Sequence, residues 1–341
     1  MEKLKFGIYI CLLQPMNKTH FAAIELALSE VDTLIIVLGS AFKAKSIKHP
    51  WTFQEREQMI RSCFDTQENN RITVIPIRDY TYNINLWITE VQKNIDSIVT
   101  DCNSITLYGY NKGKDTNYLK YFPKWGFRDI GNLGDIDPVK IRKAYFTGDL
   151  ETLIFSVRCN VFKKLQKEIN ENGIKYQELC YEFKKIEEYK ALWKSAPFPP
   201  TFVTVDAVII KSGHILVVRR KGVPGKGLIA LPGGFINSDE FIEDSCLREL
   251  KEETKIQIPK DELKKRIVES HVFDDPERST RGRTITHAFF INLGSGELPK
   301  VKGSDDAEKA WWMSLQDISK QEDMFFEDHC HIINYFVNKG C

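Results

Sequence analysis

Gly234-Phe-Ile-Asn-Ser-Asp-Glu240, followed by Arg248-Glu-Leu-Lys-Glu-Glu253, is the stretch that decides the fold of the second half of this chain. It places several carboxylates on one short helix just after a Gly-Gly turn. Residues three and four apart share a helical face, so Glu249, Glu252 and Glu253 lie together. Like charges at this spacing cost roughly 0.2–0.5 kcal/mol per pair, unless a divalent cation neutralises them, and carboxylate oxygens suit Mg2+. We therefore predict a magnesium site, with a solvated Glu/Lys helix as the alternative.

The spacing of this stretch resembles the signature of Nudix hydrolases: Gly, five residues, Glu, seven residues, then Arg-Glu-apolar-x-Glu-Glu-x-Gly-apolar. Every position fits except the closing Gly, where Lys255 precedes Ile256. Because that Gly serves the turn and not the metal, we expect an intact metal site. The resemblance implies a Nudix α/β/α sandwich fold with Mg2+, or alternatively Mn2+, as the cofactor. The implied catalytic residues and metal ligands are Glu249, Glu252 and Glu253, with the backbone carbonyl of Gly234 as a further ligand.

Length and composition bound the class of protein. A chain of 341 residues is long enough for two cores. The net charge of +1 argues against a polyanion-binding surface, and no helix-turn-helix pattern with a basic recognition helix appears, so no nucleic-acid partner is expected. Eight cysteines without C-x-x-C pairs indicate reduced thiols and a cytoplasmic location. No apolar run approaches the roughly 20 residues that span a bilayer, and residues 6–13 predict a buried strand, not a signal peptide.

Two domains are visible along the chain. In the first half, strand-like and helix-like segments alternate, which predicts βαβ units and a parallel sheet. The apolar runs are residues 6–13, 33–38, 72–77 and 105–108, and the helical patterns are residues 20–29, 52–64 and 86–99. A long charged helical pattern over 163–192 precedes Ala196-Pro-Phe-Pro-Pro200, whose prolines stop any helix. We predict domains over 1–192 and 201–341, with a Pro-rich linker over 193–200.

The second domain changes period. Residues 202–209 alternate in polarity and a Ser212-Gly213 turn follows, which predicts a β-hairpin. After the acidic helix we expect strands near 267–273 and 284–293 and a C-terminal helix around 329–338.

A candidate phosphate site lies near the N-terminus. A strand that carries Gly7 leads into Gln14-Pro-Met-Asn-Lys-Thr-His20, where a helix begins. Helix N-termini bind anions through exposed N–H groups, and parallel sheets bind nucleotides at the carboxyl ends of their strands. The alternative is that His20 is a structural cap or a surface residue.

Further segments strengthen the nucleotide hypothesis. They are residues 39–45, 49–56, 79–87, 108–112, 118–123 and 136–142. Together with the first site they resemble nicotinamide mononucleotide adenylyltransferases, specifically the fused bacterial type that carries a C-terminal Nudix domain. The resemblance covers nearly the whole chain in domain order and length. It implies an α/β class protein with an N-terminal Rossmann-like nucleotidyltransferase fold.

The resemblance also assigns roles in the N-terminal domain. His20 and Arg142 would be catalytic, stabilising phosphate charge during adenylyl transfer. The implied substrate-binding residues are Gly7, Asn17, Lys43, Lys45, Arg56, Trp87 and Lys112. Lys43, Lys45 and Arg142 are candidates for holding the triphosphate, with solvated surface charges as the alternative. Trp87 is a candidate for stacking on the nicotinamide ring, with ordinary core packing as the alternative.

Three positions depart from the adenylyltransferase pattern. The family motif His-x-Gly-His reads Asn17-Lys18-Thr19-His20 here, Val139 stands at a hydroxyl position and Gly113 at an acidic one. Removing one preorganised donor costs about 10²–10³ in rate. Two alternatives follow: a slow or re-tuned adenylyltransferase, which we favour, or a non-catalytic nucleotide sensor or oligomerisation module.

Substrate choice in the Nudix domain depends on residues outside the signature. The segment 273–283 resembles the arginine-rich stretch of ADP-ribose-cleaving members, so Arg278, Arg281 and Arg283 are candidates for contacting the pyrophosphate or terminal ribose. A basic surface loop is the alternative. Asp305, Asp306 and Glu308 precede Trp311-Trp312 in an expected loop near the metal, and any of the three is a candidate general base.

These inferences predict a cytoplasmic bifunctional enzyme of NAD metabolism. Its N-terminal domain would make NAD and pyrophosphate from ATP and nicotinamide mononucleotide. Its C-terminal domain would hydrolyse ADP-ribose to AMP and ribose 5-phosphate with Mg2+. A homo-oligomer stays open, and no membrane partner is expected.

Overall fold

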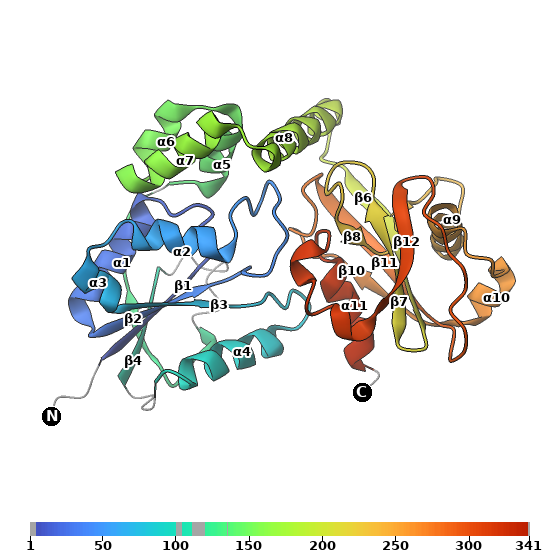
Figure 1. Ribbon diagram of the computed structural model, residues 1–341, viewed down its shortest axis with the longest axis horizontal. Coiled ribbons are helices and arrows are strands. Elements are labelled where there is room, and N and C mark those ends of the chain that lie inside the picture. The colour runs from blue at the N-terminus through green and yellow to red at the C-terminus, as the bar shows by residue number, and fades with distance from the viewer. Residues whose placement is uncertain (1–4, 100–103, 111–119, 135, 340–341) are drawn as a thin grey trace. The chain divides into compact units, whose positions relative to one another are not determined.

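The computed structural model describes residues 5–99, 104–110, 120–134 and 136–339. The chain divides into two compact units, Met1–Cys180 and Tyr181–Cys341, and each is described by itself (Figure 1). This division falls inside helix α8, ahead of the predicted Pro-rich linker. The predicted domain limits stay a prediction.

The first unit is built on a parallel sheet, as predicted. Its strands are β1 (Phe6–Cys11), β2 (Thr33–Leu38), β3 (Ile72–Pro76), β4 (Ile105–Gly109) and β5 (Gly126–Asp129). Their order is β3-β2-β1-β4-β5, and all of the pairings are parallel. The first strand therefore lies in the middle of the sheet, so the segment after it opens at the carboxyl edge where such sheets bind nucleotides. The short edge strand β5 lay outside the sequence prediction.

Eight helices begin among the described residues of this unit, and the last of them runs on into the second unit. They are α1 (Lys18–Glu30), α2 (Phe53–Arg61), α3 (Thr66–Asn70), α4 (Ile84–Asp96), α5 (Pro138–Thr147), α6 (Leu150–Ser156), α7 (Cys159–Glu171) and α8 (Ile174–Leu192). Val91 and Ile95 of α4 pack in one buried cluster with Ile8, Ile35 and Val37 of the sheet. Capping boxes fix the starts of α1, α2 and α3, which is why these helices begin where they do.

The helical pattern predicted over 163–192 is two helices. Asn172 takes a left-handed backbone conformation with φ 46°, and its N–H bonds back to the carbonyl of Glu168. This is an αL cap, which ends α7 before α8 begins two residues later. No helix among the described residues is long and apolar enough to cross a membrane.

The second unit holds a mixed seven-stranded sheet. Its strands are β6 (Thr201–Lys211), β7 (His214–Arg220), β8 (Ile229–Ala230), β9 (Gly233–Phe235), β10 (Ile267–Phe273), β11 (Arg283–Asn292) and β12 (Ala307–Ser314). The main order is β10-β11-β6-β7-β12, with β8 on β7 and β9 on β6. The predicted hairpin is present: Ser212 and Gly213, both at positive φ, join β6 to β7. Asp305 and Asp306 lie in a turn, as expected, but the expected loop ends there, because Glu308, Trp311 and Trp312 belong to β12.

Helices cover both faces of this sheet, which gives the predicted α/β/α sandwich. They are α9 (Ile242–Thr254), α10 (Lys260–Lys265) and α11 (His329–Lys339), with single 3-10 turns at Leu315–Asp317 and Glu322–Met324. Leu247 and Leu250 of α9 share a core with Phe289 of β11. The neighbouring Phe290 stacks instead on Phe336 of α11, at 5.7 Å between ring centroids. Since successive strand residues face opposite sides, α9 and α11 lie on opposite faces.

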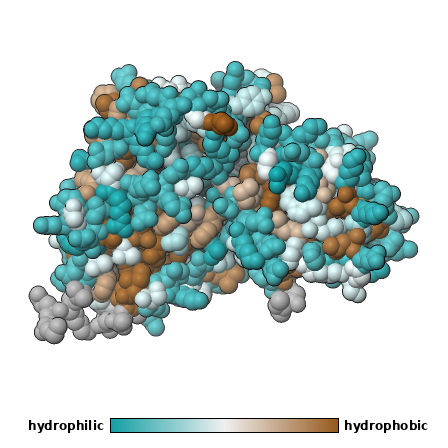
Figure 2. Space-filling model, viewed as in Figure 1, coloured by the Kyte–Doolittle hydropathy of each residue, from teal (hydrophilic) through white to brown (hydrophobic). Residues whose placement is uncertain are grey.

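The surface is mostly hydrophilic on the face shown in Figure 2, with hydrophobic side chains gathered in a few patches.

Candidate active sites

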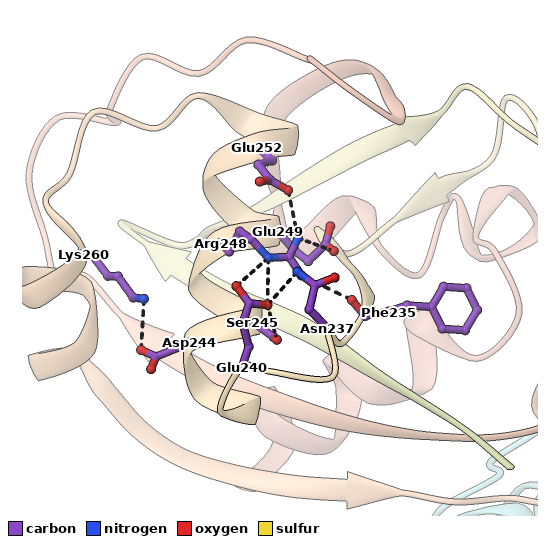
Figure 3. Close-up of polar contacts among 9 residues, drawn as sticks. All are labelled: Phe235, Asn237, Glu240, Asp244, Ser245, Arg248, Glu249, Glu252 and Lys260. Carbon is purple, nitrogen blue, oxygen red and sulfur yellow. Dashed lines mark hydrogen bonds and ion pairs between the residues drawn. The ribbon is translucent and has the colours of Figure 1, made fainter.

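Two carboxylates of α9 and one from the residues just before it meet at Arg248 (Figure 3). Arg248 Nε lies 2.9 Å from Glu240 Oε2, while Nη1 donates to Glu249 Oε1 at 2.8 Å and to Glu252 Oε2 at 2.9 Å. Its Nη2 donates to the carbonyl of Phe235 at 3.3 Å. Arg248, the arginine of the Nudix signature, thus connects Glu240, the end of the Gly-Gly turn and the acidic face of α9.

The two glycines of the turn allow β9 to approach β6 and α9 closely. A Cβ on Gly233 would lie 2.1 Å from the carbonyl oxygen of Val205, and one on Gly234 would lie 2.7 Å from the Glu249 carboxylate. Only glycine fits against the Val205 backbone, whereas a side chain at position 234 would push the Glu249 carboxylate aside. The N–H of Gly233 also donates to Glu253 Oε2 at 3.0 Å. The turn and the acidic helix therefore form one site.

The electrostatics of this site favour a cation. Burial raises the pKa of Glu253 to about 8, with the carboxylates of Glu249 and Asp306 adding to the rise and the Gly233 N–H opposing it. Burial also raises the pKa of Glu249, against the effect of Arg248, and Asp305 contributes to the rise. Both carboxyls resist ionisation without positive charge nearby, so the donor set fits a divalent ion. Among the described residues, no three His, Cys, Asp or Glu side chains lie close enough together to form a complete set of metal ligands.

Lys255 explains the one departure from the Nudix signature. It is the C-cap of α9, with φ 50° and ψ 28°, and its N–H bonds to the carbonyl of Lys251. This left-handed conformation is the one that glycine adopts readily. The expectation that the signature glycine serves the turn is therefore confirmed.

The three predicted arginines have different surroundings. Arg278 donates from Nε and Nη2 to the two oxygens of Asp328 at 2.9 Å each, and both side chains are at most 4% exposed. Arg283 lies 3.4 Å from Asp274 on the surface. Arg281 lies 5.1 Å from the ring centroid of Phe235, beside the Gly-Gly turn. Of the three arginines, Arg281 is the one that contacts a residue of the Gly-Gly turn region.

Arg220 is a site residue that sequence reasoning missed. It ends β7, donates from Nε to the carbonyl of Pro224 at 3.0 Å and packs on Phe326. Burial lowers its pKa, the charge of Arg281 lowers it further, and Glu253 opposes the shift. Arg220 therefore lies close enough to Glu253 and to Arg281 for their charges to act on it. The available signal was the Arg219-Arg220 pair at the end of a strand, just before the turn region.

The phosphate site of the first unit is organised by a capping box. Asn17 Oδ1 accepts from the N–H of His20 at 3.0 Å and from Thr19 Oγ1 at 2.7 Å. The N–H of Asn17 donates to His20 Nδ1 at 3.2 Å. Since Nδ1 is an acceptor, the neutral imidazole carries its proton on Nε2. Asn17, which replaces the family histidine, is 1% exposed and serves as the N-cap.

Arg56 is fully buried and bonds to the protein backbone. It donates to the carbonyls of Leu12, Gly39, Ser40 and Thr52. Leu12 and Gly39 directly follow β1 and β2, so Arg56 joins the carboxyl ends of these two strands. Burial lowers its pKa to about 10.

A second residue, within the segment 49–56 but given no role by the sequence, lies beside the predicted cations. Burial lowers the pKa of His49 to about 3, and the charges of Lys43 and Arg142 lower it further, against Asp79. His49 therefore brings Lys43 and Arg142 into one electrostatic neighbourhood. Arg142 Nη1 also donates to the carbonyl of Gln14 at 2.9 Å, next to the phosphate motif.

The remaining predicted residues lie elsewhere or outside the description. Lys45 pairs with Glu55 at 2.7 Å. A Cβ on Gly7 would lie 3.0 Å from Leu34, so this glycine lets the sheet pack. Trp87 packs at the edge of the sheet core, 6.1 Å from the Phe122 ring. Lys112 and Gly113 lie outside the described residues, and Val139 is exposed.

A parallel sheet with a capped helix after its first strand, in one chain with a Nudix signature helix, defines a two-domain nucleotide-processing enzyme. The NUDIX domain family matches residues 200–335. The chain is 30% identical over 151 residues to the nicotinamide/nicotinic acid mononucleotide adenylyltransferase of Acinetobacter baylyi, covering 44% of this chain and 80% of that protein. It is 38% identical over 137 residues to the ADP-ribose pyrophosphatase of Methanocaldococcus jannaschii, covering 40% and 76%.

A solved structure matches both halves at once. The bifunctional NMN adenylyltransferase/ADP ribose pyrophosphatase of Francisella tularensis, crystallised with AMP and a manganese ion, is 34% identical with a TM-score of 0.90 over 99% of each chain. The chain belongs to this family of bifunctional NMN adenylyltransferase/ADP-ribose pyrophosphatases. The resemblance drawn from the sequence is thereby confirmed.

Proposed function

We propose that the first unit transfers the adenylyl group of ATP to nicotinamide mononucleotide, giving NAD and pyrophosphate. The second unit hydrolyses ADP-ribose to AMP and ribose 5-phosphate. The observation that carries this proposal is the match to one bifunctional relative over 99% of both chains, joined with the intact acidic helix against its Gly-Gly turn. A cytoplasmic location and the absence of nucleic-acid partners stay predictions.

In the first unit, His20 supplies the main catalytic donor. Its Nε2–H, fixed by the bond from Asn17 N–H to Nδ1, can donate to a phosphate oxygen at the N-terminus of α1. Lys43 and Arg142, which share the neighbourhood of His49, hold the triphosphate. No covalent intermediate with the enzyme is needed, because the mononucleotide phosphate attacks the α-phosphorus directly, so catalysis depends on positioning and charge.

In the second unit, Glu249, Glu252 and Glu253 would hold Mg2+, or Mn2+, with the carbonyl of Gly234. When bound, the ion supplies positive charge to the diphosphate and lowers the pKa of a coordinated water. Arg281 and Arg220 bind the diphosphate beside the carboxylates, while Arg278 pairs with Asp328 and stabilises the fold of this unit. Asp305 and Asp306 raise the pKa of Glu249 and Glu253, respectively, which keeps both as general-base candidates.

Two single substitutions in the full chain test the assignment. Glu253→Gln should abolish AMP release from ADP-ribose and leave NAD synthesis unchanged. His20→Ala should lower NAD synthesis by about 10² or more, the usual cost of one preorganised donor, and leave AMP release unchanged. A wild-type protein that binds ATP but makes no NAD would instead favour the nucleotide-sensor alternative.

A further inference from the structure

A buried histidine holds the strand that enters the Gly-Gly turn. His329 is the first residue of α11 and is 6% exposed. Its Nδ1 accepts the N–H of Leu231 at 2.9 Å. Leu231 is also buried, and the next residue, Pro232, has no N–H of its own. His329 is therefore the acceptor for the last backbone donor before Gly233.

The other side of the same turn is held by β6. The N–H of Ala207 donates to the carbonyl of Pro232 at 2.8 Å, and Asp206 pairs in register with Gly233. Asp206 Oδ2 accepts from Thr286 Oγ1 at 2.6 Å, while Oδ1 lies 3.9 Å from His329 Nδ1. The turn thus lies between a strand ladder and one imidazole from the opposite face of the sheet.

We propose that His329 is a positioning residue for the metal site of the second unit. By accepting the Leu231 N–H, it fixes the backbone at which Gly233 donates to Glu253 and Gly234 lies against the Glu249 carboxylate. This inference rests on the proposed assignment of that site to a divalent ion. It adds a residue 76 positions beyond Glu253 that the Nudix signature does not contain.

The surroundings of the ring keep it an acceptor. The charged groups around it are Asp206 on β6, Arg278 on the segment after β10, and Glu327 and Asp328 just before α11. Asp328 is occupied by Arg278 through two hydrogen bonds. Burial lowers the pKa of His329, which keeps the ring neutral and its Nδ1 lone pair available. A protonated ring could not accept from Leu231.

The test compares three substitutions in the full chain. In His329→Asn the amide oxygen can occupy the position of Nδ1, whereas in His329→Gln it is displaced by one bond, and His329→Ala has no acceptor. His331→Ala is the matched control, because it removes another buried histidine from the same helix. The readouts are Mn2+ affinity by electron paramagnetic resonance titration and hydrogen exchange at the Leu231 amide, with AMP release and NAD synthesis alongside.

We expect His329→Ala and His329→Gln to weaken Mn2+ binding by about 10- to 100-fold, the usual effect of losing an outer-shell partner, and to speed exchange at Leu231. His329→Asn should stay close to wild type, and NAD synthesis should be unchanged throughout. Wild-type Mn2+ affinity in His329→Gln, or an equal loss in His331→Ala, overturns the inference alone. Failure of wild type to bind Mn2+ overturns the proposed metal site, and the inference with it.

Discussion

Arg278 and Arg281 lie three residues apart in one basic segment, yet the structure predicts a loss of stability when the first is removed and a loss of substrate binding when the second is removed. Arg278 is buried against Asp328 with two 2.9 Å bonds. Its replacement by alanine leaves the Asp328 carboxylate buried with its main cationic partner gone. Arg281 is only partly buried and lies beside Phe235. Its replacement leaves no buried charge behind.

The expected magnitudes separate the two roles. Removing one partner of a buried ion pair costs about 3–5 kcal/mol, and each kcal/mol shifts Tm by roughly 2–4 °C in a domain of this size. Arg278→Ala should therefore lower the Tm of the second unit by roughly 6–20 °C. Arg281→Ala should leave Tm nearly unchanged. If Arg281 binds the diphosphate, losing its charge-assisted bond, worth about 1.5–3 kcal/mol, should raise KM for ADP-ribose roughly 10- to 150-fold.

Calorimetry on the full chain and AMP release at varied ADP-ribose concentration measure both quantities. Below the new Tm, Arg278→Ala should keep a KM near wild type. A stable Arg278→Ala variant with a greatly raised KM would refute the structural role and return Arg278 to the substrate. An Arg281→Ala variant with unchanged KM would remove Arg281 from the site.

Three further predictions follow from the same structure. Lys255→Gly removes the strain of a left-handed non-glycine residue, worth about 1–2 kcal/mol, and adds the extra unfolding entropy of glycine, about 0.5–1 kcal/mol. Urea unfolding should therefore show a gain in the free energy of unfolding of up to about 1.5 kcal/mol with unchanged AMP release, and a loss of stability contradicts this. Burial raises the pKa of Glu253 to about 8, above its value in the unfolded chain, so the metal-free fold binds an extra proton between the two values. The contribution of Glu253 to the free energy of unfolding is therefore complete below about pH 4 and is lost as the pH rises through 8. Glu253→Gln should flatten that pH dependence in denaturant titrations. A fragment that starts at residue 181 keeps the hydrogen bond from Gly225 N–H to Glu182 and the contacts of the Tyr189 and Trp193 rings with Phe202. Its Tm should therefore be higher than that of a fragment that starts at Pro199. Equal Tm values would show that these contacts do not stabilise the second unit.

Local signals in the sequence predicted much of the fold. The acidic helix, the hairpin at Ser212-Gly213 and the parallel sheet each depend on residues close in the chain. Period, turn chemistry and spacing were sufficient for them. β12 was missed because Ala307–Ser314 alternates too weakly to stand out from a loop.

Long-range partners were beyond sequence reasoning. Arg278 and Asp328 are fifty residues apart, and nothing local marks them as a pair. The same holds for the bond from Leu231 to His329. Asn17 is of a residue type that often caps helices, so its capping role was within reach of the sequence. The bond from its N–H to His20 Nδ1 was not, because that bond depends on the folded turn.

The capping box of α1 determines both where the helix begins and which nitrogen of His20 carries the proton. The bond that closes the first turn, from Asn17 N–H to His20 Nδ1, is also the bond that puts the imidazole proton on Nε2. Fraying of this turn would release the ring to exchange tautomers, so the proton that His20 can donate depends on local folding. The heat sensitivity of adenylyl transfer would then be set by one turn of helix, well before the sheet beneath it begins to melt.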